Sequence, residues 1–184
     1  MLSAKRFAAV GLCAAGLLAQ GHGTPAHAAG THDTDAAFFD AVAGTWTGPG
    51  RIVAGKYKGT RFTCSLDGDT LADGRTGIAM GGKCRVGLFD QDMKAVIIHG
   101  SNGYEGQFMG GGGDDGLDVI SGRVEPEKVV VGINRRDLYG AMVASLKGPD
   151  TLNVTVSVKV GQQMVPVIGM TLKRIGASPA LANR

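Results

Sequence analysis

Short stretches of alternating apolar and polar residues follow one another from residue 44 almost to the end of this 184-residue chain. The clearest is LNVTVSVKV at 152–160, where Leu152 and every second residue after it are apolar and the residues between are polar. This alternation is typical of a strand with one buried and one solvated face. Similar stretches lie at 44–54, 60–67, 76–80, 83–89, 93–99, 104–110, 117–125, 128–135, 138–147 and 163–175.

Turn-forming residues separate these stretches, as at 67–69, 101–103 and 148–150. Short antiparallel strands at this spacing fit an up-and-down barrel or a sandwich better than a fold with crossover helices. Glycines occur within the strands as well as in the turns, which suits a barrel whose strands bend sharply. We therefore predict an all-β fold over residues 35–176, a single up-and-down antiparallel β-barrel of about 8–10 strands with a short N-terminal helix.

The first 28 residues have the features of a secretory signal peptide: basic Lys5 and Arg6, an apolar run at 7–19, and an A-x-A site that ends at Ala28. The apolar run is too short for a spanning helix, which needs about 20 apolar residues. We expect cleavage after Ala28 and export to a Gram-negative periplasm, with disordered tails at 29–34 and 177–184. The alternative is a lipoprotein signal with Cys13 as the lipidated residue, although Leu12 stands where such signals have Gly or Ala.

Loss of residues 1–28 removes two of the 19 lysines and arginines and none of the 16 acidic residues, which leaves a net charge of +1. A balance this small implies neither a nucleic-acid partner nor a strongly anionic membrane partner. A single domain with one core fits the remaining length.

Two cysteines, Cys64 and Cys84, remain in the predicted mature protein. An even number in an oxidising compartment favours a disulfide, and closing a loop of about 20 residues adds roughly 3 kcal/mol in the chain-entropy model. Without a CxxC motif and with few histidines, we expect neither a redox nor a metal role. Alternation places both cysteines on a buried face together with two apolar neighbours each, Phe62 and Leu66, and Val86 and Leu88.

The segment AAFFDAVAGTWTGPG at 36–50 combines a short apolar helical turn with the only tryptophan of the chain. A GxW motif placed after such a turn and before a run of strands resembles the calycins, which include lipocalins and fatty-acid-binding proteins. The resemblance implies that Gly44 and Trp46 are the motif residues and that Trp46 packs near the closed end of the barrel. It also implies that a basic residue of the last strand lies across the indole, and Arg174 fits this role better than Lys173 because it shares a face with Leu172.

The longer stretch GTWTGPGRIVAGKY at 44–57 is also similar to the opening of the nitrobindins, ten-stranded haem barrels. Those proteins hold haem iron through a histidine near the C-terminus, and this chain has no histidine after His99. Of the two histidines left after maturation, His32 lies in the predicted tail and His99 ends a strand. We therefore expect His99 to be a packed residue and predict no cofactor. The chain also resembles uncharacterised secreted bacterial barrels of this size.

The segment GGGGDDGLD at 110–118 fits the calcium-binding nonapeptide of RTX proteins. One copy cannot build the stacked site, so we expect a hairpin loop and predict no metal site. A weak calcium site on Asp114, Asp115 and Asp118 is the alternative. No GxSxG elbow accompanies His99, and we predict no catalytic residues and no enzymatic activity.

Two features bear on what the barrel binds. Arg135 and Arg136, close to Tyr139, can hold a carboxylate or phosphate headgroup at a barrel mouth, with a solvated turn as the alternative.

The stretch 163–175 is apolar on both faces, which predicts either a self-association surface or a cover formed by the N-terminal helix. The residues involved are Met164, Pro166, Ile168, Met170 and Leu172 on one face, Val165 and Val167 on the other, and Phe38, Phe39 and Val42 on the helix.

Aromatic residues make up only 5% of the chain, so the barrel can enclose an unfilled apolar cavity, to which adaptable methionines are suited. We predict a periplasmic, non-enzymatic, lipocalin-like barrel that binds a small hydrophobic or amphipathic ligand. The alternative is a structural or protein-interaction module of the cell envelope with a filled barrel.

Overall fold

The computed structural model describes residues 31–110 and 116–176, and within them one helix precedes ten strands. The predicted signal peptide at 1–28 and the predicted tail at 177–184 lie outside the described residues. The elements are α1 (Thr31–Val42), β1 (Gly44–Ile52), β2 (Arg61–Thr70), β3 (Gly77–Val86), β4 (Phe89–Gly100), β5 (Gly103–Gly110), β6 (Leu117–Glu125), β7 (Lys128–Arg135), β8 (Leu138–Leu146), β9 (Thr151–Val160) and β10 (Gln163–Ile175).

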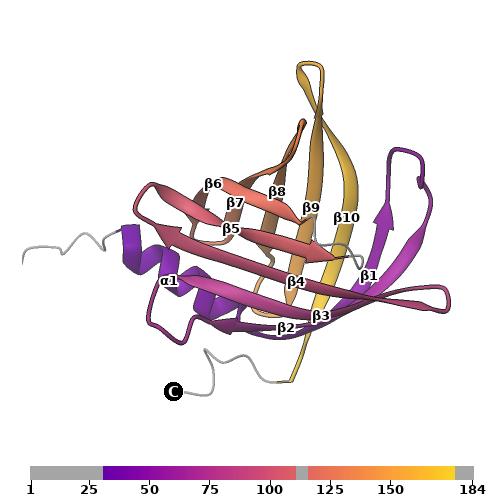
Figure 1. The fold of residues 1–184 in the computed structure, drawn as a ribbon. Coiled ribbons are helices and arrows are strands. Elements are labelled where there is room, and N and C mark those ends of the chain that lie inside the picture. Colours follow the sequence, from indigo (N-terminus) through magenta and orange to yellow (C-terminus); the bar gives the residue numbers. More distant parts are fainter. Residues whose placement is uncertain (1–30, 111–115, 177–184) are drawn as a thin grey trace, which may run out of the picture.

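Each strand pairs antiparallel with the next one along the chain, and β1 also pairs with β10, so the sheet closes on itself (Figure 1). This confirms the predicted all-β, up-and-down barrel with a short N-terminal helix. Closure leaves no strand at an open edge, which removes the unpaired backbone groups that an edge exposes.

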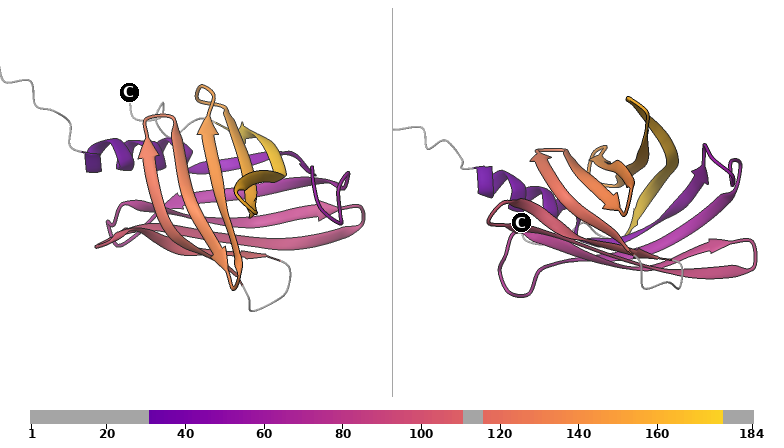
Figure 2. Two further views of the ribbon diagram at one scale, coloured as in Figure 1. Left: turned by 90° about the horizontal axis from the view of Figure 1, so that it is seen from above. Right: turned by 45° about the horizontal axis from the view of Figure 1, so that its top comes forward.

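The two ends of the barrel differ in what closes them. The closed end carries α1 and the β2–β3, β4–β5, β6–β7 and β8–β9 connections, and the other end, here called the mouth, carries the tips of the β1–β2, β3–β4, β7–β8 and β9–β10 hairpins. Both views in Figure 2 show α1 on the side of the molecule away from the β1–β2 and β3–β4 tips. Residues 111–115, which join β5 to β6 at the mouth end, are not among the described residues.

The helix begins at Thr31, so residues 31–34, predicted to be a disordered tail, are helical. Asp33 in the first turn favours this start because an acidic side chain interacts well with the positive end of the helix dipole. The helix packs against β2, β3 and β6, and not on the outer face of β10. Of the two alternatives predicted for that face, coverage by the helix is therefore wrong, and self-association stays a prediction.

Two predicted strands, 76–80 and 83–89, are one strand, β3, which ends at Val86. Gly82 lets it run on past a bend, because its φ of 149° suits glycine and an added Cβ would lie 2.1 Å from the Ser65 carbonyl oxygen. Beyond Val86, Gly87 with φ 59° forms the β3–β4 turn. Leu88 therefore lies in this turn and is 96% exposed, so its predicted burial beside Cys84 is wrong.

The last strand contains a β-bulge at Val167, where the register to β9 shifts between Pro166 and Ile168. Pro166 has no N–H to donate, which favours an irregularity at this point. The bulge moves the residues before it to the opposite face. Val165 pairs with Val158, whereas Met164 is exposed and does not share the inner face of Ile168 as predicted.

Candidate functional site

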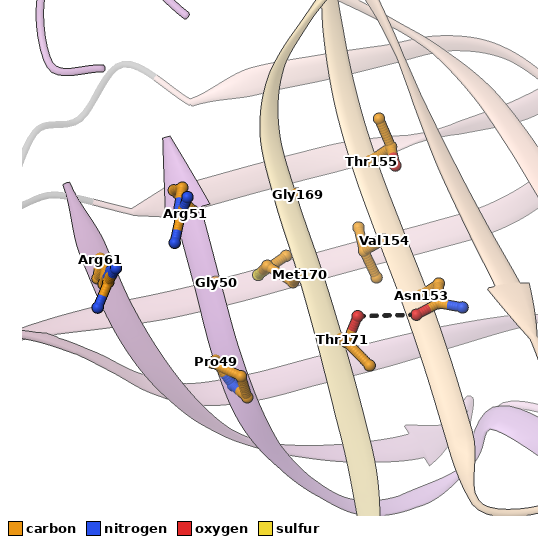
Figure 3. Close-up of a pocket in the computed structure, with 10 residues that line it drawn as sticks. All are labelled: Pro49, Gly50, Arg51, Arg61, Asn153, Val154, Thr155, Gly169, Met170 and Thr171. Atoms are coloured by element: carbon orange, nitrogen blue, oxygen red, sulfur yellow. Dashed lines mark hydrogen bonds between the residues drawn. The ribbon is translucent and has the colours of Figure 1, made fainter. Parts of the chain in front are cut away.

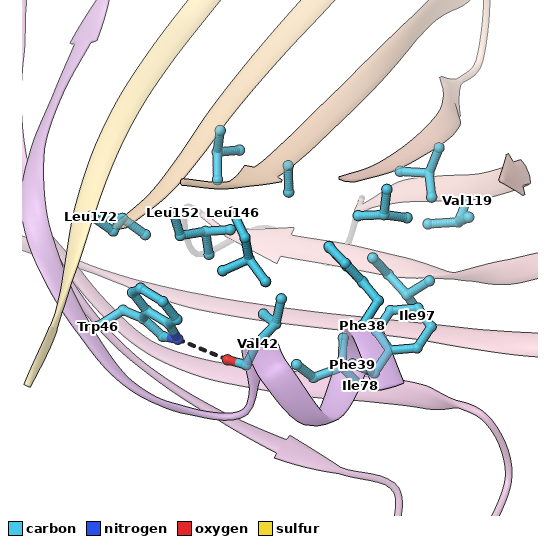
Figure 4. Close-up of a cluster of buried hydrophobic side chains, with 14 of the residues drawn as sticks. Phe38, Phe39, Val42, Trp46, Ile78, Ile97, Val119, Leu146, Leu152 and Leu172 are labelled. Carbon is cyan, nitrogen blue, oxygen red and sulfur yellow. Dashed lines mark hydrogen bonds between the residues drawn. The ribbon is translucent and has the colours of Figure 1, made fainter. Parts of the chain in front are cut away.

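The closed end is fixed by Trp46, which is 0% exposed. Its indole Nε1–H donates a hydrogen bond of 2.8 Å to the Val42 carbonyl oxygen at the end of α1 (Figure 4). This bond satisfies one of the carbonyl groups that a helix leaves unpaired at its C-terminus. Gly44, with φ 122°, allows the chain to turn from the helix directly into β1.

Arg174 on β10 completes this end of the barrel. Its guanidinium carbon lies 4.1 Å from the Trp46 ring centroid, as the calycin resemblance implies. The same group donates to the carbonyl oxygens of Ala41, Ala43 and Pro149, the last two at 2.6 and 2.9 Å. Burial lowers the pKa of the guanidinium, and nearby Asp150 partly opposes that shift. One side chain thus ties the last strand, the helix end and the β8–β9 turn together.

A second buried contact joins the helix to the wall. The Tyr104 hydroxyl on β5 donates to Asp35 Oδ2 on α1 at 2.5 Å, and both residues are buried. Burial, together with the Asp35 carboxylate, raises the pKa of the Tyr104 hydroxyl far above its usual value. The His99 ring packs edge-on against Tyr104, with ring centroids 5.0 Å apart. His99 therefore belongs to the packing of the closed end.

The barrel encloses an apolar cavity of about 340 Å³, which extends from α1 toward the mouth. This volume lies within the range of small-molecule sites. Its described lining carries no Asp, Glu, His, Ser, Thr or Tyr. The residues that line it are Phe38, Phe39, Val42, Phe62, Leu66, Ile78, Met80, Cys84, Val86, Gln91, Met93, Lys94, Ala95, Ile97, Phe108, Leu117, Val129, Ile133, Met142, Ala144, Leu152, Val154, Val156, Ile168, Met170 and Leu172.

Several features of this wall bear on what it can hold. It includes four methionines, whose flexible thioethers adapt to ligands of different shape. The two polar residues of the described lining, Gln91 and Lys94, both lie on β4 in the part nearer the mouth. Lys94 is exposed and stands between Met93 and Ala95, which both line the cavity, so strand alternation directs its side chain outward and the inner surface is apolar.

The predicted disulfide joins Cys64 on β2 to Cys84 on β3, which are directly paired across the two strands. Both cysteines are buried, as alternation predicts, and Cys64 Sγ lies 3.9 Å from Met170 Sδ on the opposite side of the β1 strand. The bond braces the wall on the mouth side of the β2–β3 pair.

The proposed headgroup residues lie together at the β7–β8 turn of the mouth. Arg135 ends β7, Arg136 has a positive φ of 54°, and Tyr139 is the second residue of β8. Asn134 Nδ2 stabilises the turn by donating to the Arg136 and Leu138 carbonyl oxygens. None of the three proposed residues lines the cavity, so a ligand can meet them only where it emerges from the mouth.

A second hollow of about 630 Å³ lies over β1, β2, β9 and β10 and is lined largely by outward-facing residues (Figure 3). Arg51 and Arg61 are direct partners across β1 and β2, and Thr171 donates to Asn153 Oδ1 at 2.9 Å. The space beside Gly169 is open, because no atom lies within 4 Å of the position that a Cβ would take there. The hollow is an exposed depression on the wall, and we take the internal cavity as the candidate site.

Among residues 31–110 and 116–176, no cluster of three or more His, Cys, Asp or Glu residues can hold a metal ion. Asp114 and Asp115 of the proposed calcium segment lie outside the described residues, and Asp118 accepts a hydrogen bond of 3.2 Å from Gln107 Nε2. In the same part of the chain, no helix has the length and hydrophobicity needed to span a membrane.

A crystal structure of Rv2717c from M. tuberculosis is similar to this chain, with a TM-score of 0.52 at 11% sequence identity. The match covers 74% of this chain and 94% of that one. No protein-family model matches the sequence, and a search of curated proteins finds no match. A structural similarity at this level of identity supports the barrel fold, which is compatible with the calycin-like resemblance, and it carries no information on the ligand.

Sequence reasoning did not identify the wall of the cavity residue by residue. Its members come from α1 and from every described strand except β1, and each of these nine strands supplies between one and five of them. Alternation marks which face of a strand is apolar, but it does not show which apolar residues leave space between them. The usable signal was composition, namely few aromatic residues and several methionines.

Proposed function

We propose that this protein is a non-enzymatic carrier that binds a small hydrophobic or amphipathic molecule inside its barrel, and that it works in the periplasm. The observation that carries the proposal is the apolar cavity of about 340 Å³. A barrel that served only as a structural or interaction module would gain stability by filling this space, because each unfilled volume costs packing energy. The cavity therefore favours the carrier over the filled-barrel alternative.

The size of the cavity limits the apolar part of the ligand. At about 30 Å³ for each water-sized group, the cavity holds roughly ten such groups, as in a medium-length acyl chain or a small terpenoid. Each buried methylene adds about 0.8 kcal/mol. We expect the affinity for saturated fatty acids to rise with chain length up to decanoate and then level off as longer chains extend into solvent.

Fluorescence titration with the lipophilic dye N-phenyl-1-naphthylamine, followed by displacement with fatty acids of increasing length, tests this proposal. Ala144→Phe places a ring inside the cavity and should abolish dye binding. Val143→Phe is the matched control, because Val143 pairs with Thr155 on the outer face of the same strand. The control should bind dye as the unaltered protein does.

Native mass spectrometry of the protein purified from its own cells, with its N-terminus determined in the same spectrum, tests the carrier and its export together. We expect a mature chain that begins at Ala29 and carries a bound small molecule, released by solvent extraction. A ligand-free protein that takes up neither dye nor fatty acid would refute the carrier and favour the envelope interaction module.

A further inference from the structure

Exposed large hydrophobic residues are concentrated at the mouth. Of the twelve in the described residues, Ile120 and Ile175 lie elsewhere, nine lie on or beside the hairpin tips of the mouth, and Met109 lies at the mouth end of β5. Leu88 and Phe89 at the β3–β4 turn are the most exposed, at 96% and 80%. The ten are Val53, Tyr57, Val86, Leu88, Phe89, Met109, Leu138, Tyr139, Val160 and Met164.

These tips lie at the end of the barrel away from α1 and extend in different directions. In Figure 1 the β9–β10 hairpin extends upward, whereas both views in Figure 2 show the β1–β2 and β3–β4 hairpins together on the side away from α1. The cavity wall includes Val86 of β3, next to the β3–β4 tip. Leu88 and Phe89 are adjacent and almost fully exposed, and a contiguous exposed apolar patch marks a protein or membrane interaction site. Their position beside the wall of an apolar cavity indicates that the surface they contact is also the source or the destination of the ligand.

The β1–β2 hairpin adds positive charge to this end. It carries Arg51, Lys56, Lys58 and Arg61, and no acidic residue occurs between Asp40 and Asp67. None of these four side chains takes part in an ion pair within the described part of the chain. Tyr57 lies between the two lysines, and the Lys56 ammonium lies 5.5 Å from its ring centroid. The acidic pair Asp114 and Asp115 belongs to the segment 111–115, outside the described residues.

We propose that the mouth docks reversibly on an anionic phospholipid bilayer, with the apolar β3–β4 tip inserted at the interface and the neighbouring β1–β2 hairpin held by lipid headgroups. Basic residues near an anionic surface contribute about 1 kcal/mol each, and apolar side chains buried at the interface add to this. In this orientation a ligand passes between the bilayer and the cavity without crossing water. The transfer of a ligand between the bilayer and the cavity rests on the proposed carrier function, whereas the docking itself does not.

A second copy of the chain fits the mouth less well. A two-fold symmetric, mouth-to-mouth dimer would bring the same surface to both sides, so the cations of two β1–β2 hairpins would be concentrated at one interface. Anionic headgroups neutralise these charges instead. The charge of the hairpin therefore favours the bilayer over self-association.

Co-sedimentation with vesicles tests the proposal, using protein exported to the periplasm of the expressing cells. We expect binding to vesicles of phosphatidylcholine with phosphatidylglycerol, weak binding to phosphatidylcholine alone, and loss of binding at high salt. Lys56→Gln with Lys58→Gln should weaken partitioning about 25-fold, and Leu88→Ser with Phe89→Ser should weaken it roughly tenfold or more.

The matched controls carry equal changes away from the mouth. Lys147→Gln with Lys173→Gln removes two charges at the closed end, and Ile120→Ser with Ile175→Ser removes two exposed apolar side chains that lie outside the mouth. Both should bind vesicles as the unaltered protein does. Failure to bind anionic vesicles, or equal losses in mouth and control variants, would overturn the proposal. A dimer in solution that Leu88→Ser with Phe89→Ser dissociates would also overturn it, since a second copy would then cover the mouth.

The Ala144→Phe variant separates this proposal from the carrier function. Its mouth is unchanged, so it should lose dye binding and keep vesicle binding. Dye uptake without vesicle binding in the unaltered protein would refute the docking alone. Vesicle binding without uptake of dye or fatty acid would refute the carrier alone.

Discussion

The closed end of this barrel buries polar groups, whereas the mouth exposes apolar side chains to water. At the closed end, Trp46, Arg174 and Tyr104 bring polar groups inside and give each of them a partner. No buried side-chain nitrogen or oxygen of the described residues lacks a hydrogen-bond partner. At the mouth, Leu88 and Phe89 are exposed to solvent. The comparison indicates that stability is concentrated at one end, which leaves the other end free to make contacts outside the molecule.

Removal of an aromatic side chain from each end should give the largest difference in the free energy of unfolding. Trp46→Ala should lower the free energy of unfolding by about 4 kcal/mol, because it creates a cavity and leaves the Val42 carbonyl without its donor. Phe89→Ala should change it by less than about 0.5 kcal/mol, because the ring is already exposed. Urea denaturation followed by circular dichroism measures both. Equal losses would show that the mouth tips are part of the folded core.

The disulfide tests whether the mouth is stabilised separately from the rest of the barrel. Cys64→Ala with Cys84→Ala should lower the free energy of unfolding by about 3 kcal/mol in a single cooperative transition, because the loop it closes spans 20 residues. The measurement is the same urea titration on oxidised protein and on the double variant. An unchanged midpoint together with a loss of dye binding would instead show that the bond stabilises only the mouth side of the wall.

The closed end was largely predictable from the sequence, whereas the mouth was not. The contact between Trp46 and Arg174 is what the calycin resemblance of the GxW motif implies, and strand alternation favoured Arg174 over Lys173. Leu88 was wrongly placed in the interior because alternation continues past Val86, and only the positive φ of Gly87 shows that the strand has ended. The bulge at Val167 was missed for a similar reason, since one extra residue reverses the faces without changing the apolar pattern.

Net charge gave no indication of the surface at the mouth. The predicted mature chain is almost neutral, yet the fold carries Lys56 and Lys58 on a hairpin where the apolar tips gather. The cavity was predictable as a possibility of composition only, because its wall is assembled from residues far apart in the chain. The cavity and the surface of the mouth each combine residues from several strands, and for this reason only the structure shows them.

Substitution of one arginine at each end compares how much the two ends contribute to stability. Arg174→Met keeps the apolar stem but removes the cation over Trp46 and the donors to the Ala41 and Ala43 carbonyl oxygens. We expect a loss of about 2 kcal/mol in the free energy of unfolding. Arg61→Met, which removes an exposed arginine from the β1–β2 hairpin, should have little effect on unfolding. Urea denaturation monitored by Trp46 fluorescence compares the two, and similar losses would show that Arg174 is not a special anchor.

The smallest effect concerns the pH dependence of the closed end. Because the pKa of the Tyr104 hydroxyl is raised in the folded protein, the fold holds this proton more tightly than the unfolded chain does. The stabilisation is complete below the unfolded tyrosine pKa of about 10 and is lost progressively as the pH rises above it. Tyr104→Phe should lower stability by about 1 kcal/mol at neutral pH through loss of the bond to Asp35.

The same variant should also show a shallower fall in stability above pH ~10 than the unaltered protein, by up to about 1.4 kcal/mol per pH unit. Tyr139→Phe at the mouth is the matched control, since Tyr139 is exposed and should leave both the neutral-pH stability and the slope unchanged. Urea midpoints measured from neutral to alkaline pH supply both readings, and lysines contribute equally in all three proteins. Identical alkaline slopes in the unaltered protein and Tyr104→Phe would mean that Tyr104 is not the group that couples the closed end to pH.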